Sequence, residues 1–191
     1  GLYTNIVTNE FAEKIGKSEE ELYRLAKENT NRIFPSEVRN MAEVISEIIF
    51  GEDGELLPED EEFRNMMTET PDDKSMYVIT NKSKLFGAAA MLYEENLYDL
   101  SQQLDSDLYI LPSSTHEVIA ISDKFGDANE LADMVYEINM DQVELSDRLS
   151  NQVYHYDKDA RTLRLATNKF ERTISDDIKE KVPEIEEGKA R

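Results

Sequence analysis

The sequence predicts an α+β protein in which a small N-terminal helical bundle precedes a mainly antiparallel sheet with helices packed on it. In residues 1–50, apolar side chains recur at every third or fourth position, as on one face of a helix. After residue 75, short runs rich in β-branched and aromatic residues alternate with helical stretches, and turn residues separate them. We expect this second part to follow the order ββαββαββ, without an internal repeat.

Three short helices are expected in the first part of the chain. The first ends at a glycine, and Ser18 with Glu21 forms the capping-box signature of the second, which ends before Pro35. Ser36 is expected to open the third helix, since serine is a preferred N-cap residue. We therefore predict a helical subdomain over residues 1–51.

The composition then changes, and residues 52–75 carry acidic side chains together with glycine, proline and threonine. A calcium-binding loop is one interpretation, because carboxylates bind hard cations. The EF-hand pattern places its first ligand five positions before an internal glycine, and counting back from Gly54 puts Ile49 there. An acidic linker is therefore the prediction for this segment.

The second part opens with a predicted pair of strands. Met76–Thr80 is rich in strand-forming residues, and the apolar run Gly87–Leu92 is expected to pair with it. Three consecutive alanines in this run also allow the start of a helix, but Gly87 breaks the pattern before them, which favours a strand. A helix is then expected through Leu97 and Leu104.

Two hairpins are predicted on either side of a further helix. Leu108–Leu111 is a continuous apolar run typical of a strand covered on both faces, and residues 117–122 supply the returning strand. Asp127 is expected to cap the helix that follows. Val153–Ala166 alternates in polarity and forms the second predicted hairpin. The predicted division of this part is an α+β domain over residues 76–170 and a charged tail or marginal helix over residues 171–191.

Three segments of the second part carry a resemblance to a known family: Met76–Lys82, Gly87–Tyr93 and, above all, Asp107–Ile119. They resemble an uncharacterised bacterial family, a domain of unknown function common in gut Firmicutes. The resemblance extends less specifically to Asn29-Thr30, Phe34-Pro35 and Val153–Asp157. It implies a shared fold, a bacterial intracellular setting and a position in the carboxy-terminal portion of a longer protein, and it carries no catalytic residues onto this chain.

Charge is the largest anomaly of the composition, with 42 acidic against 21 basic residues and a formal net charge of −21. Such a field repels phosphate backbones and anionic lipids, so we expect neither nucleic acid nor a membrane as partner. The acids are interspersed with apolar residues, which suits solubility in a cytoplasm; the functional interpretations are a basic protein partner and mimicry of nucleic acid. No stretch approaches the roughly 18 apolar residues of a membrane span, so a cytoplasmic location is expected.

Reactive side chains gather at one predicted turn, Pro112–Glu117. A hydroxyl, an imidazole and a carboxylate are the parts of a hydrolytic triad, and Ser114, His116 and Glu117 supply them beside Ser113. No glycine flanks either serine as in a nucleophile elbow, and serine after proline is ordinary turn composition, which favours a structural turn.

Metal and cofactor sites are not predicted. The chain has no cysteine and two histidines, so a site with both His116 and His155 would require the two hairpins to meet. Phosphate-binding glycine loops are absent from the sequence, and no nucleotide cofactor is expected.

We expect a noncatalytic protein-interaction or regulatory module of a bacterial cytoplasm, with another protein, of basic character, as the partner. The alternative is a hydrolase or metal-dependent enzyme centred on the Pro112–Glu117 turn, with Ser114, His116 and Glu117 as its candidate catalytic residues.

Overall fold

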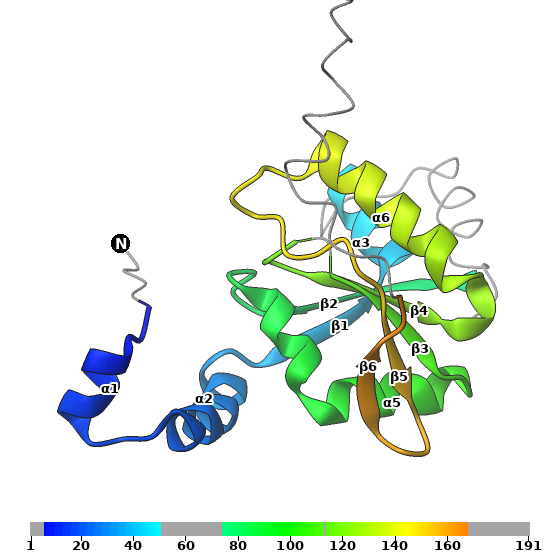
Figure 1. The fold of residues 1–191 in the computed structure, drawn as a ribbon. Helices are drawn as coiled ribbons and strands as arrows, with labels where there is room; N and C mark the ends of the chain where they lie inside the picture. Colours follow the sequence, from blue (N-terminus) through cyan, green and yellow to red (C-terminus); the bar gives the residue numbers. More distant parts are fainter. Residues whose placement is uncertain (1–5, 51–73, 113, 168–191) are drawn as a thin grey trace, which may run out of the picture.

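The computed structural model describes residues 6–50, 74–112 and 114–167, and within them the chain forms an α+β fold built on one antiparallel sheet (Figure 1). The helices are α1 (Asn9–Ile15), α2 (Glu19–Ile33), α3 (Met41–Phe50), the 3-10 helix η2 (Gly87–Leu92), α5 (Glu94–Leu104), the 3-10 helix η3 (Asp123–Phe125) and α6 (Ala128–Gln142). The strands are β1 (Ser36–Asn40), β2 (Met76–Asn81), β3 (Leu108–Leu111), β4 (Val118–Ser122), β5 (Tyr154–Asp157) and β6 (Thr162–Leu165).

The described strands form a six-stranded sheet in the order β1-β2-β4-β3-β5-β6, and each neighbouring pair is antiparallel. The two predicted hairpins, β3 with β4 and β5 with β6, are confirmed. Their registers place Ile110 opposite Ala120 and Tyr154 opposite Leu165. The sheet therefore combines two local hairpins with pairings between strands that are distant in the sequence.

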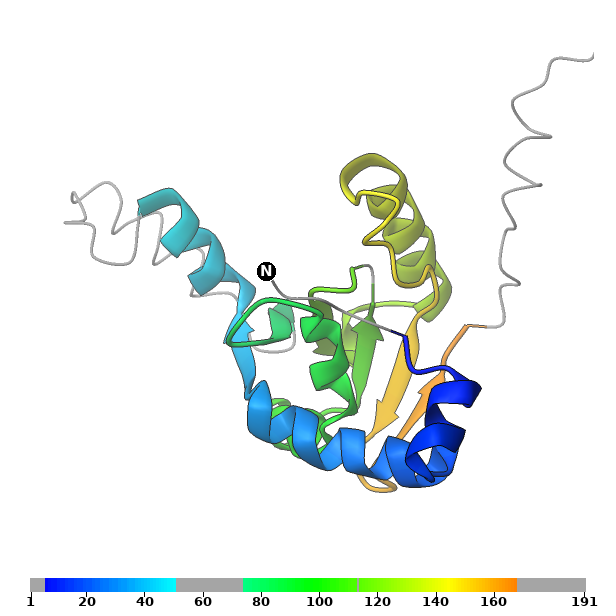
Figure 2. The same ribbon diagram turned by 90° about the vertical axis from the view of Figure 1, so that its left-hand side faces the viewer.

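Both faces of the sheet are covered, as the continuous apolar run of β3 predicts. Ile79, Leu108 and Ile110 lie on one face in a buried cluster with Leu97 and Leu100 of α5. Figure 2 shows η2 on the same side and α6 on the opposite side of the strands.

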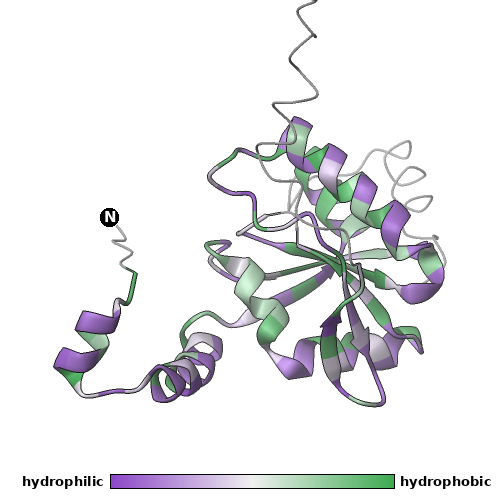
Figure 3. Cartoon of the chain, viewed as in Figure 1, coloured by the Kyte–Doolittle hydropathy of each residue, from purple (hydrophilic) through white to green (hydrophobic). Residues whose placement is uncertain are grey.

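The second buried cluster lies under α6. There Leu131 and Val135 of that helix join Ile121, Leu111 and Val153. In Figure 3 the hydrophobic colouring follows the central strands, whereas the helices alternate between polar and apolar faces. The alternation of the strands and the helical spacing of α5 and α6 therefore bury two separate apolar layers.

The prediction of a strand at Gly87–Leu92 is wrong, because this segment forms the 3-10 helix η2. Its first residue lies so close to β2 that a Cβ there would meet the Thr80 side chain and the backbone of His116. The backbone N–H of Ala88 donates to the carbonyl of Thr115, outside any strand ladder. Small residues let this turn sit directly on the sheet face, where Ala90 is buried.

The prediction that Ser36 opens a third helix is also wrong. Ser36 begins β1, whose Val38 pairs with Ile79 of β2. The helix starts five residues later, at Met41, where the Asn40 side chain accepts a hydrogen bond from the backbone N–H of Ala42. Pairing with β2 satisfies the backbone groups of this segment, which overrides its local helical pattern.

The N-terminal helices form a pair, and both follow their local signals. In α2 the Ser18 hydroxyl accepts from the Glu21 N–H and the Glu21 carboxylate accepts from the Ser18 N–H, as the capping box predicts. Helix α1 ends at Gly16, whose φ of 65° is in the left-handed region that glycine favours. Both helices lie to one side of the sheet and its covering layers (Figure 1).

Several predictions fall partly or wholly outside the described residues. The acidic linker over 52–75 lies outside them except for its last two residues, and the charged tail over 171–191 and Ser113 lie entirely outside. The proposed domain boundaries stay predictions. None of the described helices is long and apolar enough to span a bilayer.

Candidate functional site

The hydroxyl of Ser114 has a structural role in the Pro112–Glu117 turn. Ser114 is buried and forms an isolated bridge with Arg148. Its Oγ accepts a hydrogen bond of 3.0 Å from the backbone N–H of His116. This contact closes the turn, and the described residues show no hydrogen bond between the Ser114 hydroxyl and the imidazole of His116.

The imidazole of His116 faces the carboxylate of Asp147, which the sequence did not indicate. Its Nε2 lies 3.6 Å from Oδ1 of Asp147, which the loop after α6 supplies. The backbone N–H of Thr115 donates to the Asp147 carbonyl at 2.8 Å and holds this loop against the turn. Glu117, which is half-buried, forms none of the ion pairs found in the described part of the chain. The structure thus brings together Ser114, His116 and Asp147, with no hydrogen bond from the hydroxyl to the ring.

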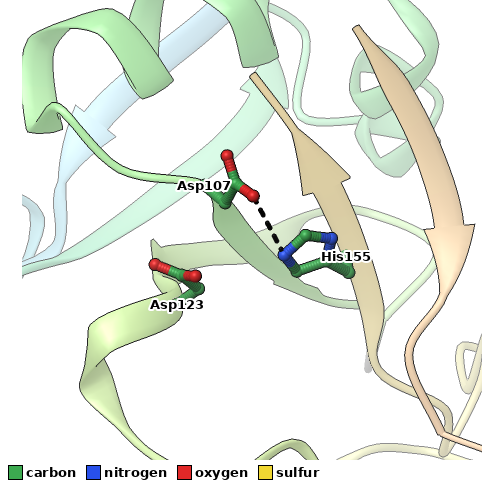
Figure 4. Close-up of side chains that lie close together, drawn as sticks. All are labelled: Asp107, Asp123 and His155. Atoms are coloured by element: carbon green, nitrogen blue, oxygen red, sulfur yellow. Dashed lines mark ion pairs between the residues drawn. The ribbon is translucent and has the colours of Figure 1, made fainter. Parts of the chain in front are cut away.

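A second constellation lies at the opposite end of the same hairpin and consists of Asp107, Asp123 and His155. Asp107 directly precedes β3 and Asp123 directly follows β4. The antiparallel register pairs Leu108 with Ser122, so the two aspartates lie together at the same end of these two strands. His155 joins them because β5 lies beside β3. One potential ligand atom of each residue lies within 4.8 Å of the others (Figure 4).

Hydrogen bonds to the surrounding backbone and side chains fix both carboxylates. Oδ1 of Asp107 accepts from the backbone N–H of Lys158 at 3.0 Å. Oδ1 of Asp123 accepts from the hydroxyl of Ser106 at 2.6 Å, and Ser106 also contacts the buried hydroxyl of Ser122 at 2.7 Å. The nearest approach to the imidazole is made by the other oxygen of Asp107, which lies 3.4 Å from Nε2 of His155.

The neighbouring lysines are bound elsewhere. The ammonium of Lys158 lies 2.6 Å from Oδ1 of Asp105, and the ammonium of Lys124 donates to the backbone carbonyl of Asp105 at 3.0 Å. The hydrogen bond with Lys158 lowers the pKa of the Asp105 carboxyl and raises that of the lysine. Within the described ranges, no lysine or arginine forms an ion pair with Asp107 or Asp123.

Tyr109 forms one wall of this constellation. Its ring packs edge-on against His155, with a centroid distance of 5.6 Å and an interplanar angle of 64°. Burial raises the pKa of the Tyr109 phenol, and the carboxylates of Asp123 and Asp127 raise it further. The phenol therefore stays protonated and neutral at physiological pH.

Two carboxylate oxygens and one imidazole nitrogen form a donor set that can bind a divalent cation. In the sequence, His155 pointed to a metal site only in combination with His116, and no pattern singled out the two aspartates. The signal available in the sequence was the position of the aspartates at the outer ends of one predicted hairpin. The contribution of His155 depends on the register of β5 beside β3, which no local pattern specifies.

Comparison with known proteins gives one match. Residues 1–158 match a family of unknown function, DUF5688. No curated protein and no solved structure matches the chain. Since the match covers most of the sequence, the chain belongs to the DUF5688 family.

Proposed function

We propose that this chain is a noncatalytic protein-interaction module of a bacterial cytoplasm, which docks another protein through helices α1 and α2. The observation that carries the proposal is that none of the described residues of α1 or α2 is buried. Several of their large apolar side chains are about half exposed: Phe11 52%, Ile15 44%, Tyr23 57% and Ile33 55%. Covering such side chains removes apolar surface from water, which favours association.

Local interactions favour both helices, and none of their described residues is buried in the core. The Thr8 side chain caps α1 and the capping box starts α2, as described above. Lys14 with Glu10 and Arg24 with Glu28 add ion pairs at a spacing of four residues, which favours helix. A preformed helical surface loses little conformational freedom on binding, which suits a docking element.

The proposed occupant of this surface is a different protein with basic groups around an apolar patch. Two copies of this chain would each bring a formal charge of −21 to the contact, so long-range repulsion opposes self-association. The same field attracts a basic partner and accelerates its encounter. The net charge therefore favours a complex with a different, basic protein over a homodimer.

The test uses a photoreactive amino acid in place of Tyr23 in the full-length protein, produced in its native host. We expect one dominant crosslinked partner, which Phe11→Asp removes and Leu145→Asp retains, because Leu145 is 73% exposed but lies outside α1 and α2. The purified partner should be basic, and Phe11→Asp should weaken its binding at least tenfold. Equal effects of the two substitutions, a crosslink to a second copy or no dominant partner would refute the proposal.

The alternative is a hydrolase or metal-dependent enzyme centred on the Pro112–Glu117 turn, and the approach of His116 to Asp147 at 3.6 Å is what favours it. A carboxylate beside an imidazole can orient it as a base. The corresponding test is turnover by the purified chain on a broad panel of esters, amides and phosphoesters. Activity that Ser114→Ala and His116→Ala both abolish would support this alternative.

A further inference from the structure

We infer that Asp107, Asp123 and His155 bind one divalent cation of the zinc class, a site separate from the proposed docking helices. Asp107 lies in the loop before β3, Asp123 opens η3 and His155 lies in β5, and one ligand atom of each lies within 4.8 Å of the others. Figure 4 shows the two carboxylates and the imidazole ring gathered around one space at the end of the hairpin. The donor set is mixed, because an imidazole nitrogen accompanies two carboxylate oxygens.

The spacing of the imidazole and its nearest carboxylate suits a shared cation. Nε2 of His155 lies 3.4 Å from Oδ2 of Asp107. Hydrogen bonds between nitrogen and oxygen span about 2.7–3.2 Å. Two donors that each lie about 2.0–2.1 Å from a tetrahedral zinc ion are about 3.3–3.4 Å apart. In the described part of the chain the imidazole donates no hydrogen bond to either aspartate, so Nε2 is available as a ligand.

The charge of the constellation also favours a bound cation. Two carboxylates within 4.8 Å of one another repel, and no described lysine or arginine pairs with either of them. The two lysines that could do so, Lys124 and Lys158, are both held by Asp105. A divalent cation bound between the carboxylates would neutralise this local excess.

The carboxylates are oriented before a cation arrives. The backbone N–H of Lys158 holds one oxygen of Asp107, and the buried hydroxyl of Ser106 holds one oxygen of Asp123. The second oxygen of each carboxylate forms no hydrogen bond in the described ranges and can serve as a ligand. Outer partners of this kind fix the ligands of metal sites and raise their affinity.

The donor types select the class of cation. Calcium and magnesium take six or more oxygen ligands, which three residues with one imidazole do not supply. Thiolate-seeking ions have no ligand in a chain without cysteine. Zinc accepts imidazole and carboxylate together at a coordination number of four, which leaves one position for water. The bound ion would join β5 to the ends of β3 and β4, and so link the two hairpins.

Calorimetric titration of the full chain with zinc chloride at physiological salt tests the site. We expect one ion per chain, with at least a tenfold loss of affinity in Asp107→Asn, Asp123→Asn and His155→Gln. His116→Gln is the matched control, because its ring also faces a carboxylate, and among the described residues this is Asp147 alone. Magnesium and calcium at millimolar concentration should not displace the zinc. Thermal unfolding without metal verifies that each variant folds.

Proton NMR of the unaltered chain gives a second measurement that needs no variant of the site. The chain has two histidines, so His116→Gln assigns both sets of ring signals. Zinc should shift the His155 signals at one equivalent and leave those of His116 in place. The inference is wrong if both rings respond alike, if neither responds, or if several weak sites survive His155→Gln, which would indicate nonspecific binding by the acidic surface.

Discussion

Gly87 illustrates how one residue positions the turn before β4. A Cβ added there would lie 2.9 Å from the backbone nitrogen of Asn81, and closer still to Oγ1 of Thr80 and the carbonyl oxygen of His116. Real Cβ atoms do not approach backbone atoms this closely, so the neighbouring strand would have to move. The hydrogen bond of 2.7 Å from Thr80 to the His116 carbonyl passes through the same space.

We therefore expect Gly87→Ala to lower the free energy of unfolding by about 2 kcal/mol, a typical cost of overpacking a tight site. Urea unfolding followed by circular dichroism measures the change. Gly126→Ala is the matched control, because no atom lies within 4 Å of its added Cβ and its backbone is extended. That variant should stay within about 0.5 kcal/mol of the parent. Equal stability of the two variants would contradict the close approach.

Ile110 tests whether the sheet is buried between its two layers. Its side chain is fully buried in the cluster with α5, so Ile110→Ala should lower the free energy of unfolding by about 2–5 kcal/mol. Ile48→Ala removes the same atoms from a side chain that is 78% exposed, and should change stability by less than about 0.5 kcal/mol. Both values come from urea unfolding, and a small effect of Ile110→Ala would argue against the described core.

At the scale of the element, helix α2 depends on its cap. Because none of its described residues is buried, its stability is local, and Ser18→Ala should weaken it by about 1 kcal/mol without lowering the melting temperature of the sheet. Hydrogen exchange of the α2 amides measures the local change, and thermal unfolding measures the global one. A large fall in the global melting temperature would mean that α2 packs on the core.

The same cap predicts a pH dependence of α2. The hydrogen bond from Lys17 and the one from the Ser18 N–H lower the pKa of Glu21 below its ordinary value. A carboxyl whose pKa falls on folding stabilises the helix above the unfolded pKa, and this contribution is lost as pH falls through the folded pKa. NMR secondary shifts over α2 should decrease as the pH falls through the pKa of Glu21 in the folded helix, and Glu21→Gln should remove this part of the acid transition. An unchanged acid transition in Glu21→Gln would contradict the assignment.

The elements predicted correctly from the sequence are those whose signals are local. The β3–β4 hairpin follows from two apolar runs around a proline turn, and Asp127 caps α6 through hydrogen bonds to its first N–H groups. The edge strand β1 was missed because its backbone groups are satisfied by β2, about 40 residues away in the sequence. The helix η2 was missed because its alanines suit several conformations and the close contact at Gly87 decides between them.

The same distinction applies to the sites. The partner of His116 comes from a loop after α6, and His155 meets Asp107 only through the pairing of β5 with β3. Neither contact follows from residue type or spacing. The predicted turn at Pro112–Glu117 was nevertheless placed correctly between its two strands.

At the scale of the whole molecule, charge sets the response to salt. A chain with a formal charge of −21 repels itself when compact, and added salt screens this repulsion over a Debye length of about 10 Å at 0.1 M. We expect the melting temperature to rise by several degrees between low salt and about 0.5 M sodium chloride, as measured by scanning fluorimetry. Potassium chloride should act equally, and a fall in melting temperature in both salts would contradict this explanation.

The strand order also has a consequence for folding kinetics. The hairpins β3–β4 and β5–β6 close short loops, whereas β2 reaches β4 only after closing a loop of about 40 residues. Strand β1 pairs in the sheet with β2 alone, so its docking requires that β2 be already in place. In pulse-labelled refolding, the amides of Ser36–Asn40 should gain protection after those of the central hairpin. The edge of the sheet formed by β1 should therefore be the last part of it to become native.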